Sequence, residues 1–116
     1  MIPEELEHSG LEAPGLPEGE PGWPADSFRD ALRRLPGATA VIAIQVFDPA
    51  PWGYAATDDT WHCVRLRGEL AGTFAARSRR EAESWVADFP RGDVLFVPTF
   101  SSQDDADSAA AWRLRA

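Results

Sequence analysis

Lysine and asparagine are absent from this 116-residue sequence, and cysteine, methionine and tyrosine each occur only once. The codons of lysine, asparagine and tyrosine are rich in A and T, so a GC-rich bacterial or phage genome explains the all-arginine basic set better than selection for arginine chemistry does. One cysteine excludes an intrachain disulfide, and with a single nearby histidine it cannot form a zinc site alone. Because disulfides mark oxidising compartments, this composition favours a reducing one.

The chain also lacks a long hydrophobic run. Its longest, residues 40–44 (AVIAI), is far short of the roughly 20 apolar residues that cross a lipid bilayer. The N-terminal sequence MIPEELEHSG is acidic, whereas a signal peptide begins with basic residues and continues with an apolar stretch. These absences predict a soluble cytoplasmic protein that does not bind membranes.

What the chain does contain is material for one hydrophobic core, because 44% of its residues are hydrophobic and five are tryptophan. A chain of this length typically folds as one domain. The net charge of −8 is uneven, since residues 1–25 hold six Glu and no basic residue. This segment is rich in Pro, Gly and Glu and lacks periodicity, so we expect residues 1–25 to be a disordered or loosely docked acidic arm and 26–116 a single α+β domain.

Apolar stripes at helical spacing predict helices over residues 26–35 and 79–89, the second preceded by a capping box formed by Ser78 and Glu81. Gly68 and Glu69 resemble the two-residue link of a β-hairpin. Strands are expected at 38–47, 60–67, 70–76 and 93–98, and a further short strand at 53–57 within a loop over 48–59. The sequence does not decide whether the C-terminal segment forms a short helix or a strand at 111–115.

The resulting order is α-β-β-β-α-β, with or without a final helix. It predicts an α+β fold with a mixed four-stranded sheet and the helices on one face. The connection from strand 70–76 through a helix to strand 93–98 is long enough for a parallel crossover, which would be right-handed.

Residues 60–66 (TWHCVRL) place the single cysteine beside one of the two histidines. Side chains alternate between the faces of a strand, so His62 and Cys63 point in opposite directions and cannot form a nucleophile–base pair. We therefore predict no catalytic residue here. Arg65 and Arg67 would lower the pKa of Cys63 if its thiol were exposed.

Two acidic clusters are candidates for metal binding, namely Asp58 with Asp59 and the run Asp104, Asp105 and Asp107. Carboxylates bind Mg²⁺ and Ca²⁺, but the spacing of a calcium loop, with its central Gly and terminal Glu, is missing. Turn formation and helix capping explain both clusters more simply. We predict no metal and, in the absence of a glycine-rich phosphate loop, no cofactor.

A basic cluster, Arg77, Arg79 and Arg80, lies at the expected start of the second helix. The predicted order, a helix followed by three strands and a second helix that begins with basic residues, resembles the double-stranded-RNA-binding domain in outline. That resemblance implies contacts between these three residues and RNA phosphates. The sequence departs from the family because the Gly-Pro-x-His loop is missing. The simpler interpretation is a solvated helix start whose arginines pair with Glu81 and Glu83.

No catalytic constellation or cofactor fingerprint is present, so the leading hypothesis is a non-enzymatic protein-binding module. Small bacterial or phage immunity proteins, antitoxins and anti-defence inhibitors are of this kind. The alternative is a nucleic-acid-binding domain, and the third is a small enzyme whose site is not recognisable. A protein partner is expected, and a homo-oligomer is an alternative. Trp23 would either pin the arm to the domain or anchor a partner. The candidate binding residues are Trp23, Trp61, Arg65, Arg67, Arg77, Arg79 and Arg80.

Overall fold

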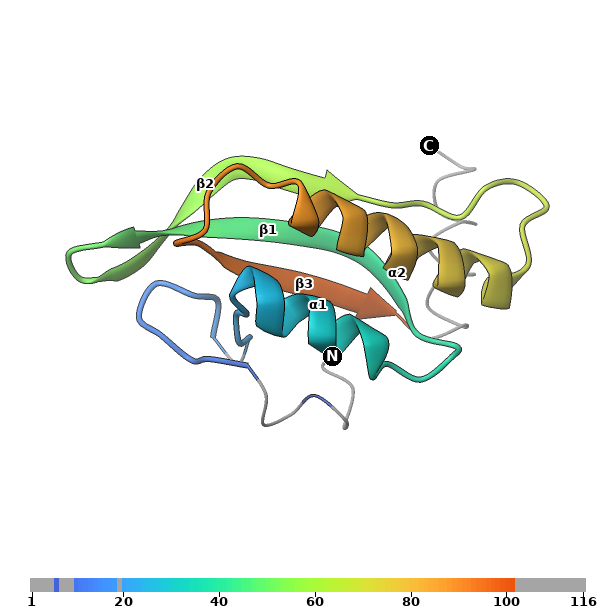
Figure 1. Cartoon of the computed structure of the whole chain (residues 1–116), viewed down its shortest axis with the longest axis horizontal. Helices are drawn as coiled ribbons and strands as arrows, with labels where there is room; N and C mark the ends of the chain where they lie inside the picture. The colour runs from blue at the N-terminus through green and yellow to red at the C-terminus, as the bar shows by residue number, and fades with distance from the viewer. Residues whose placement is uncertain (1–5, 7–9, 19, 102–116) are drawn as a thin grey trace.

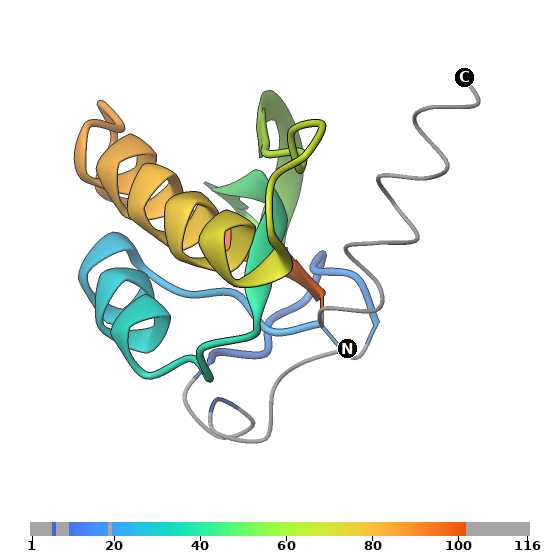
Figure 2. The same ribbon diagram turned by 90° about the vertical axis from the view of Figure 1, so that its right-hand side faces the viewer.

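The computed structural model describes residues 6, 10–18 and 20–101, which form two helices and a three-stranded sheet (Figure 1). The elements are α1 (Ala25–Arg33), β1 (Ala40–Ala50), β2 (Gly53–His62), α2 (Ala71–Ala87) and β3 (Leu95–Ser101). The sheet has the order β2-β1-β3, and both pairings are antiparallel. Both helices lie on the same face of the sheet, as Figure 2 shows. No helix in these described ranges is both long and apolar enough to cross a membrane.

The α+β class is as predicted, but the mixed four-stranded sheet is wrong. Residues 71–76, expected as part of a strand, are the first turns of α2. They continue the buried stripe of that helix, in which Ala71, Phe74, Ala75, Ser78, Ala82 and Val86 recur at helical spacing. The alanine-rich composition favours a helix over a strand. No hairpin therefore forms around Gly68, and the predicted parallel crossover is replaced by antiparallel pairing of β3 with β1.

Ser78 is not a helix cap, because α2 begins seven residues earlier, at Ala71. Ser78 lies in the middle of α2, where its side chain is buried and makes two hydrogen bonds. The Ser78 Oγ donates to the Ala75 carbonyl (2.9 Å) and accepts from the Val41 N–H of β1 (3.0 Å). Ser78 therefore joins α2 to the sheet.

The region predicted as a loop over 48–59 is mostly strand. β1 runs to Ala50 and β2 starts at Gly53, so the two form a long hairpin. The pairing shifts between Gln45 and Phe47, where Thr57 turns its Oγ1 inward and donates to the Val46 carbonyl (2.9 Å). Residues 57–59 of β2 thus lie opposite the single residue Val46, which is a β-bulge. The strand predicted for 60–67 ends at His62.

The N-terminal arm contributes to the core within its described part. Leu6 and Trp23 are fully buried, and Trp23 stacks on Phe28 with a centroid separation of 6.1 Å. The Trp23 N–H donates to the Phe96 carbonyl (2.9 Å), and the Phe96 N–H donates back to Trp23 (2.8 Å). Residues 10–18 and 20–24 extend from β3 towards the β1–β2 turn in Figure 1. Within the described part of this segment, Leu6 and Trp23 therefore pack into the core.

Candidate functional site

His62 and Cys63 lie on opposite sides of the chain. His62 is exposed at the end of β2, whereas the Cys63 side chain is buried against Ala40, Phe74 and Ala75. The Cys63 N–H still donates to the Ile42 carbonyl of β1 (3.1 Å), so the chain is extended through this residue. The two side chains do not form a catalytic pair.

The Cys63 thiol is also electrostatically unsuited to nucleophilic attack. Its Sγ donates to Glu81 Oε2 (3.4 Å) and accepts from Arg77 Nη1 (3.4 Å). Burial and then the hydrogen bond to Glu81 raise the pKa of Cys63 to about 11, which outweighs the opposing effect of Arg77. The thiol is therefore protonated near neutral pH.

Arg77 and Glu69 form the best-defined polar pair of the described chain. Arg77 Nε lies 2.7 Å from Glu69 Oε2, and Arg77 Nη2 lies 2.8 Å from Glu69 Oε1. This bidentate geometry is the strong form of a guanidinium–carboxylate interaction. The hydrogen bond from Arg77, followed by one from the Leu66 N–H, lowers the pKa of Glu69 to about 2. The same pairing raises the pKa of Arg77.

The pair fixes the segment that joins β2 to α2, which we call the 64–70 loop. Arg77 Nη2 also donates to the Val64 carbonyl (2.7 Å), and Glu69 Oε1 accepts from the Leu66 N–H (2.9 Å). Gly68, at φ +81°, allows the tight turn that brings Glu69 back towards α2. Arg65 Nε closes the turn by donating to the Glu69 carbonyl (2.6 Å). Both the start and the end of the loop are held by charged groups.

Apolar side chains project from this fixed loop into solvent. Val64 is 37% exposed, Leu66 58% and Leu70 72%. The other large apolar side chains that are exposed in the described chain, Leu11 and Trp52, lie on the arm and at the β1–β2 turn. The 64–70 loop therefore carries the densest group of exposed apolar side chains in the described residues.

The three arginines predicted at a helix start lie within α2, beyond its first turn, and do not act together. Arg77 binds Glu69 and Glu81, and Arg79 Nη1 donates to the Leu35 and Pro36 carbonyls, at 3.1 and 3.3 Å, just after α1. Arg79 thus joins α2 to the segment that follows α1. Of the three, only Arg80 is exposed, and it makes no side-chain hydrogen bond or ion pair within the described residues. The structure does not assemble these side chains into one phosphate-binding surface.

The two tryptophans among the candidate residues differ in exposure. Trp23 is fully buried and pins the arm, so it offers no surface for a partner. Trp61, on β2, is half-buried and packs against both hydrophobic clusters. Of the two, only Trp61 presents part of its ring at the surface.

Asp59 of β2 and Asp48 of β1 share an ion-pair cluster. Arg91, which follows α2, contacts Asp48 at 2.7 Å and Asp59 at 3.1 Å. Asp58 is exposed beside this cluster. No group of three or more His, Cys, Asp or Glu in the described part of the chain could hold a metal ion. The run from Asp104 to Asp107 lies outside the described residues.

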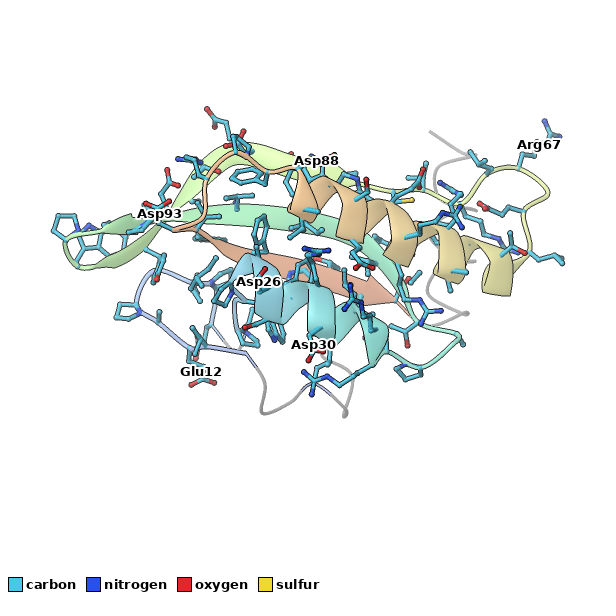
Figure 3. All side chains as sticks on the ribbon, viewed as in Figure 1. Glu12, Asp26, Asp30, Arg67, Asp88 and Asp93 are labelled. Atoms are coloured by element: carbon cyan, nitrogen blue, oxygen red, sulfur yellow. The ribbon has the colours of Figure 1, made fainter. Side chains whose placement is uncertain are left out.

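Charge is unevenly distributed over the molecule. Residues 63–81 contain five Arg and two Glu, a net charge of +3, whereas the other described residues contain four Arg and eleven Asp or Glu, a net charge of −7. In Figure 3, Arg67 lies at one end of the long axis, and Asp93 and Glu12 lie towards the other end. The exposed apolar side chains of the 64–70 loop are therefore set in a basic region of an acidic protein.

The sequence interpretation missed the central residue of this site, Glu69, which it placed in a hairpin turn. The sequence interpretation did expect the arginines of this cluster to pair with Glu81, and Arg77 does so along α2. Nothing local indicates that Glu69 folds back along α2, because that contact depends on the helix starting at Ala71. Comparison of the chain with protein-family models, curated proteins and solved structures gave no match.

Proposed function

We propose that this is a non-enzymatic, cytoplasmic protein-binding module whose contact surface is centred on the 64–70 loop. The carrying observation is that three exposed apolar side chains, Val64, Leu66 and Leu70, project from a loop held by the Glu69–Arg77 pair. Exposed apolar groups gathered in one place favour association with another protein. Because the loop is already held in place, little conformational entropy is lost when a partner binds.

The charge around the loop supports a partner with an acidic surface. Arg67 is exposed beside Leu66, and the segment carries a net positive charge. An acidic partner would be steered to this end of the molecule and repelled by the acidic remainder. We propose that the partner is a toxin or a defence protein. Such proteins are bound by small immunity proteins, antitoxins or anti-defence inhibitors of bacteria and phages.

The experiment is capture of partners by the full chain from a GC-rich bacterial lysate, followed by mass spectrometry. The test variant is Leu66→Glu with Leu70→Glu, and the matched control is Leu11→Glu with Trp52→Glu, which removes exposed apolar groups elsewhere. We expect a specific protein with the parent chain and the control, and none with the loop variant. Retention of that protein by a folded loop variant would reject the surface, and capture of nucleic acid alone would reject the function.

A further inference from the structure

The two edges of the sheet are not equivalent. On β3, the outward-facing N–H and carbonyl of Phe96 are paired with Trp23 of the arm. Two residues on, Pro98 has no N–H to offer. The β3 edge is thus closed by the arm and by proline, so a further strand would have little to pair with there.

The β2 edge is open along its second half. Cys63 donates its N–H to β1, and Trp61 pairs with Ile44, so alternation of an antiparallel ladder turns the backbone groups of Thr60 and His62 outward. No backbone hydrogen bond within the described residues reaches the outer side of these two residues. At the other end of β2 the edge is occupied, because the Pro14 carbonyl accepts from the Tyr54 N–H (2.8 Å).

The open stretch has an ordered charge pattern. Asp58 and Asp59 precede it, uncharged residues occupy 60–64, and Arg65 and Arg67 follow it. A second copy running antiparallel brings the acidic end of each edge beside the basic end of the other. A copy running parallel would instead place acid beside acid and base beside base, which is unfavourable. The edge is therefore self-complementary in one orientation only.

We infer that two copies of this chain associate through antiparallel pairing of their β2 edges. Thr60 of each copy exchanges backbone hydrogen bonds with His62 of the other, and the two Trp61 side chains become neighbours as a non-hydrogen-bonded pair. The exposed part of each Trp61 ring is thereby covered. Leu66 and Leu70 lie beyond the paired stretch, so a different partner can still reach the 64–70 loop.

The test uses charge reversal at Asp58 and Arg67. Both side chains are exposed, and neither forms an ion pair within the described residues. Sedimentation equilibrium of the full chain should show a monomer–dimer equilibrium below roughly 1 mM protein. Asp58→Arg and Arg67→Glu should each raise the dissociation constant about tenfold. Together in one chain they restore the complementary pattern, so the double variant should return to within about threefold of the parent.

Arg80→Glu is the matched control, because it makes the same charge change on α2 away from the edge and should leave the dissociation constant unchanged. Amide hydrogen exchange supplies a second measurement that needs no variant. Exchange of the Thr60 and His62 amide protons should slow as the protein concentration rises. Exchange of the Cys63 amide proton, which already donates to β1, should not change with concentration. A monomer at all concentrations, or a dimer that is insensitive to both reversals, would overturn the inference. Neither measurement involves another protein, so failure here is distinct from failure of the proposed function.

Discussion

Arg77 of α2 binds both carboxylate oxygens of Glu69, at 2.7 and 2.8 Å, and donates from the same guanidinium to the Val64 carbonyl. One side chain thus fixes both ends of the 64–70 loop to a helix. The arrangement accounts for a short loop that exposes apolar side chains and yet has a defined shape. Both charges are largely shielded, since the side chain of Glu69 is 8% exposed and that of Arg77 20%.

Replacing Arg77 should destabilise the protein because it leaves the Glu69 carboxylate shielded and unpaired. We expect Arg77→Ala to lower the free energy of unfolding by about 2 kcal/mol, less than for a fully buried pair because solvent screens part of the interaction. Urea denaturation measures it. The matched control, Arg80→Ala, removes an exposed arginine of the same helix and should change stability by less than about 0.5 kcal/mol. Equal effects of the two variants would mean that the Glu69–Arg77 pair does not hold the loop.

The Glu69–Arg77 pair also predicts that the stability of the protein falls at acidic pH. The pKa of Glu69 falls from 4.5 to about 2 on folding, so the unfolded chain binds a proton at this site more readily. The contribution of Glu69 is therefore complete above pH 4.5 and is lost as the pH falls towards 2. Melting temperatures of the parent and of Glu69→Gln, measured from pH 6 to 2, should converge on acidification. Parallel curves would contradict the assignment.

Cys63 should be a slow nucleophile in the folded protein. With a pKa of about 11, its thiolate fraction at pH 8 is roughly a hundredfold below that of a free cysteine, and burial slows access further. Reaction with a disulfide reagent should be slow in buffer and fast in denaturant. Rapid modification of the native chain at pH 8 would contradict both the burial and the hydrogen bond to Glu81.

Ser78 offers a test of the corrected helix. Ser78→Ala removes the acceptor of the Val41 N–H and leaves that buried group without a partner, so we expect a loss of roughly 1–3 kcal/mol. Ser84→Ala, on the exposed side of the same helix, is the control and should be nearly neutral. If Ser78 were an exposed cap at a helix start, its removal would instead cost no more than an ordinary surface cap and Val41 exchange would be unaffected.

The two central errors in predicting the fold have different physical origins. The segment 70–76 contains small residues and a single Phe74, so seven residues alone do not separate helix from strand. Only its continuity with the stripe through Ala82 and Val86 shows a long helix. The strand expected at 53–57 is the first half of β2, but its continuation through Asp58 and Asp59 was not predicted, because a partly exposed edge strand need not carry the apolar run that made β1 evident.

The proposed contact surface was less predictable than the fold. Trp61, Arg65 and Arg67 were among the candidate residues and do lie at or beside the 64–70 loop and the open β2 edge. Trp23 was grouped with them because exposure cannot be read from residue type, and it is buried. Glu69 was not a candidate, because its partner is eight residues away and becomes near only when α2 starts immediately after the loop.

The most direct test of the proposed contact surface is the affinity of the captured partner for the full chain, measured by calorimetry. Leu66→Glu with Leu70→Glu should weaken binding at least about a hundredfold, because central apolar contacts carry most of the energy of an interface. Leu11→Glu with Trp52→Glu should stay within about threefold of the parent. Circular dichroism must first show that both variants are folded. Equal affinity of the loop variant and the control would contradict the account, since the 64–70 loop would then not be where the partner binds.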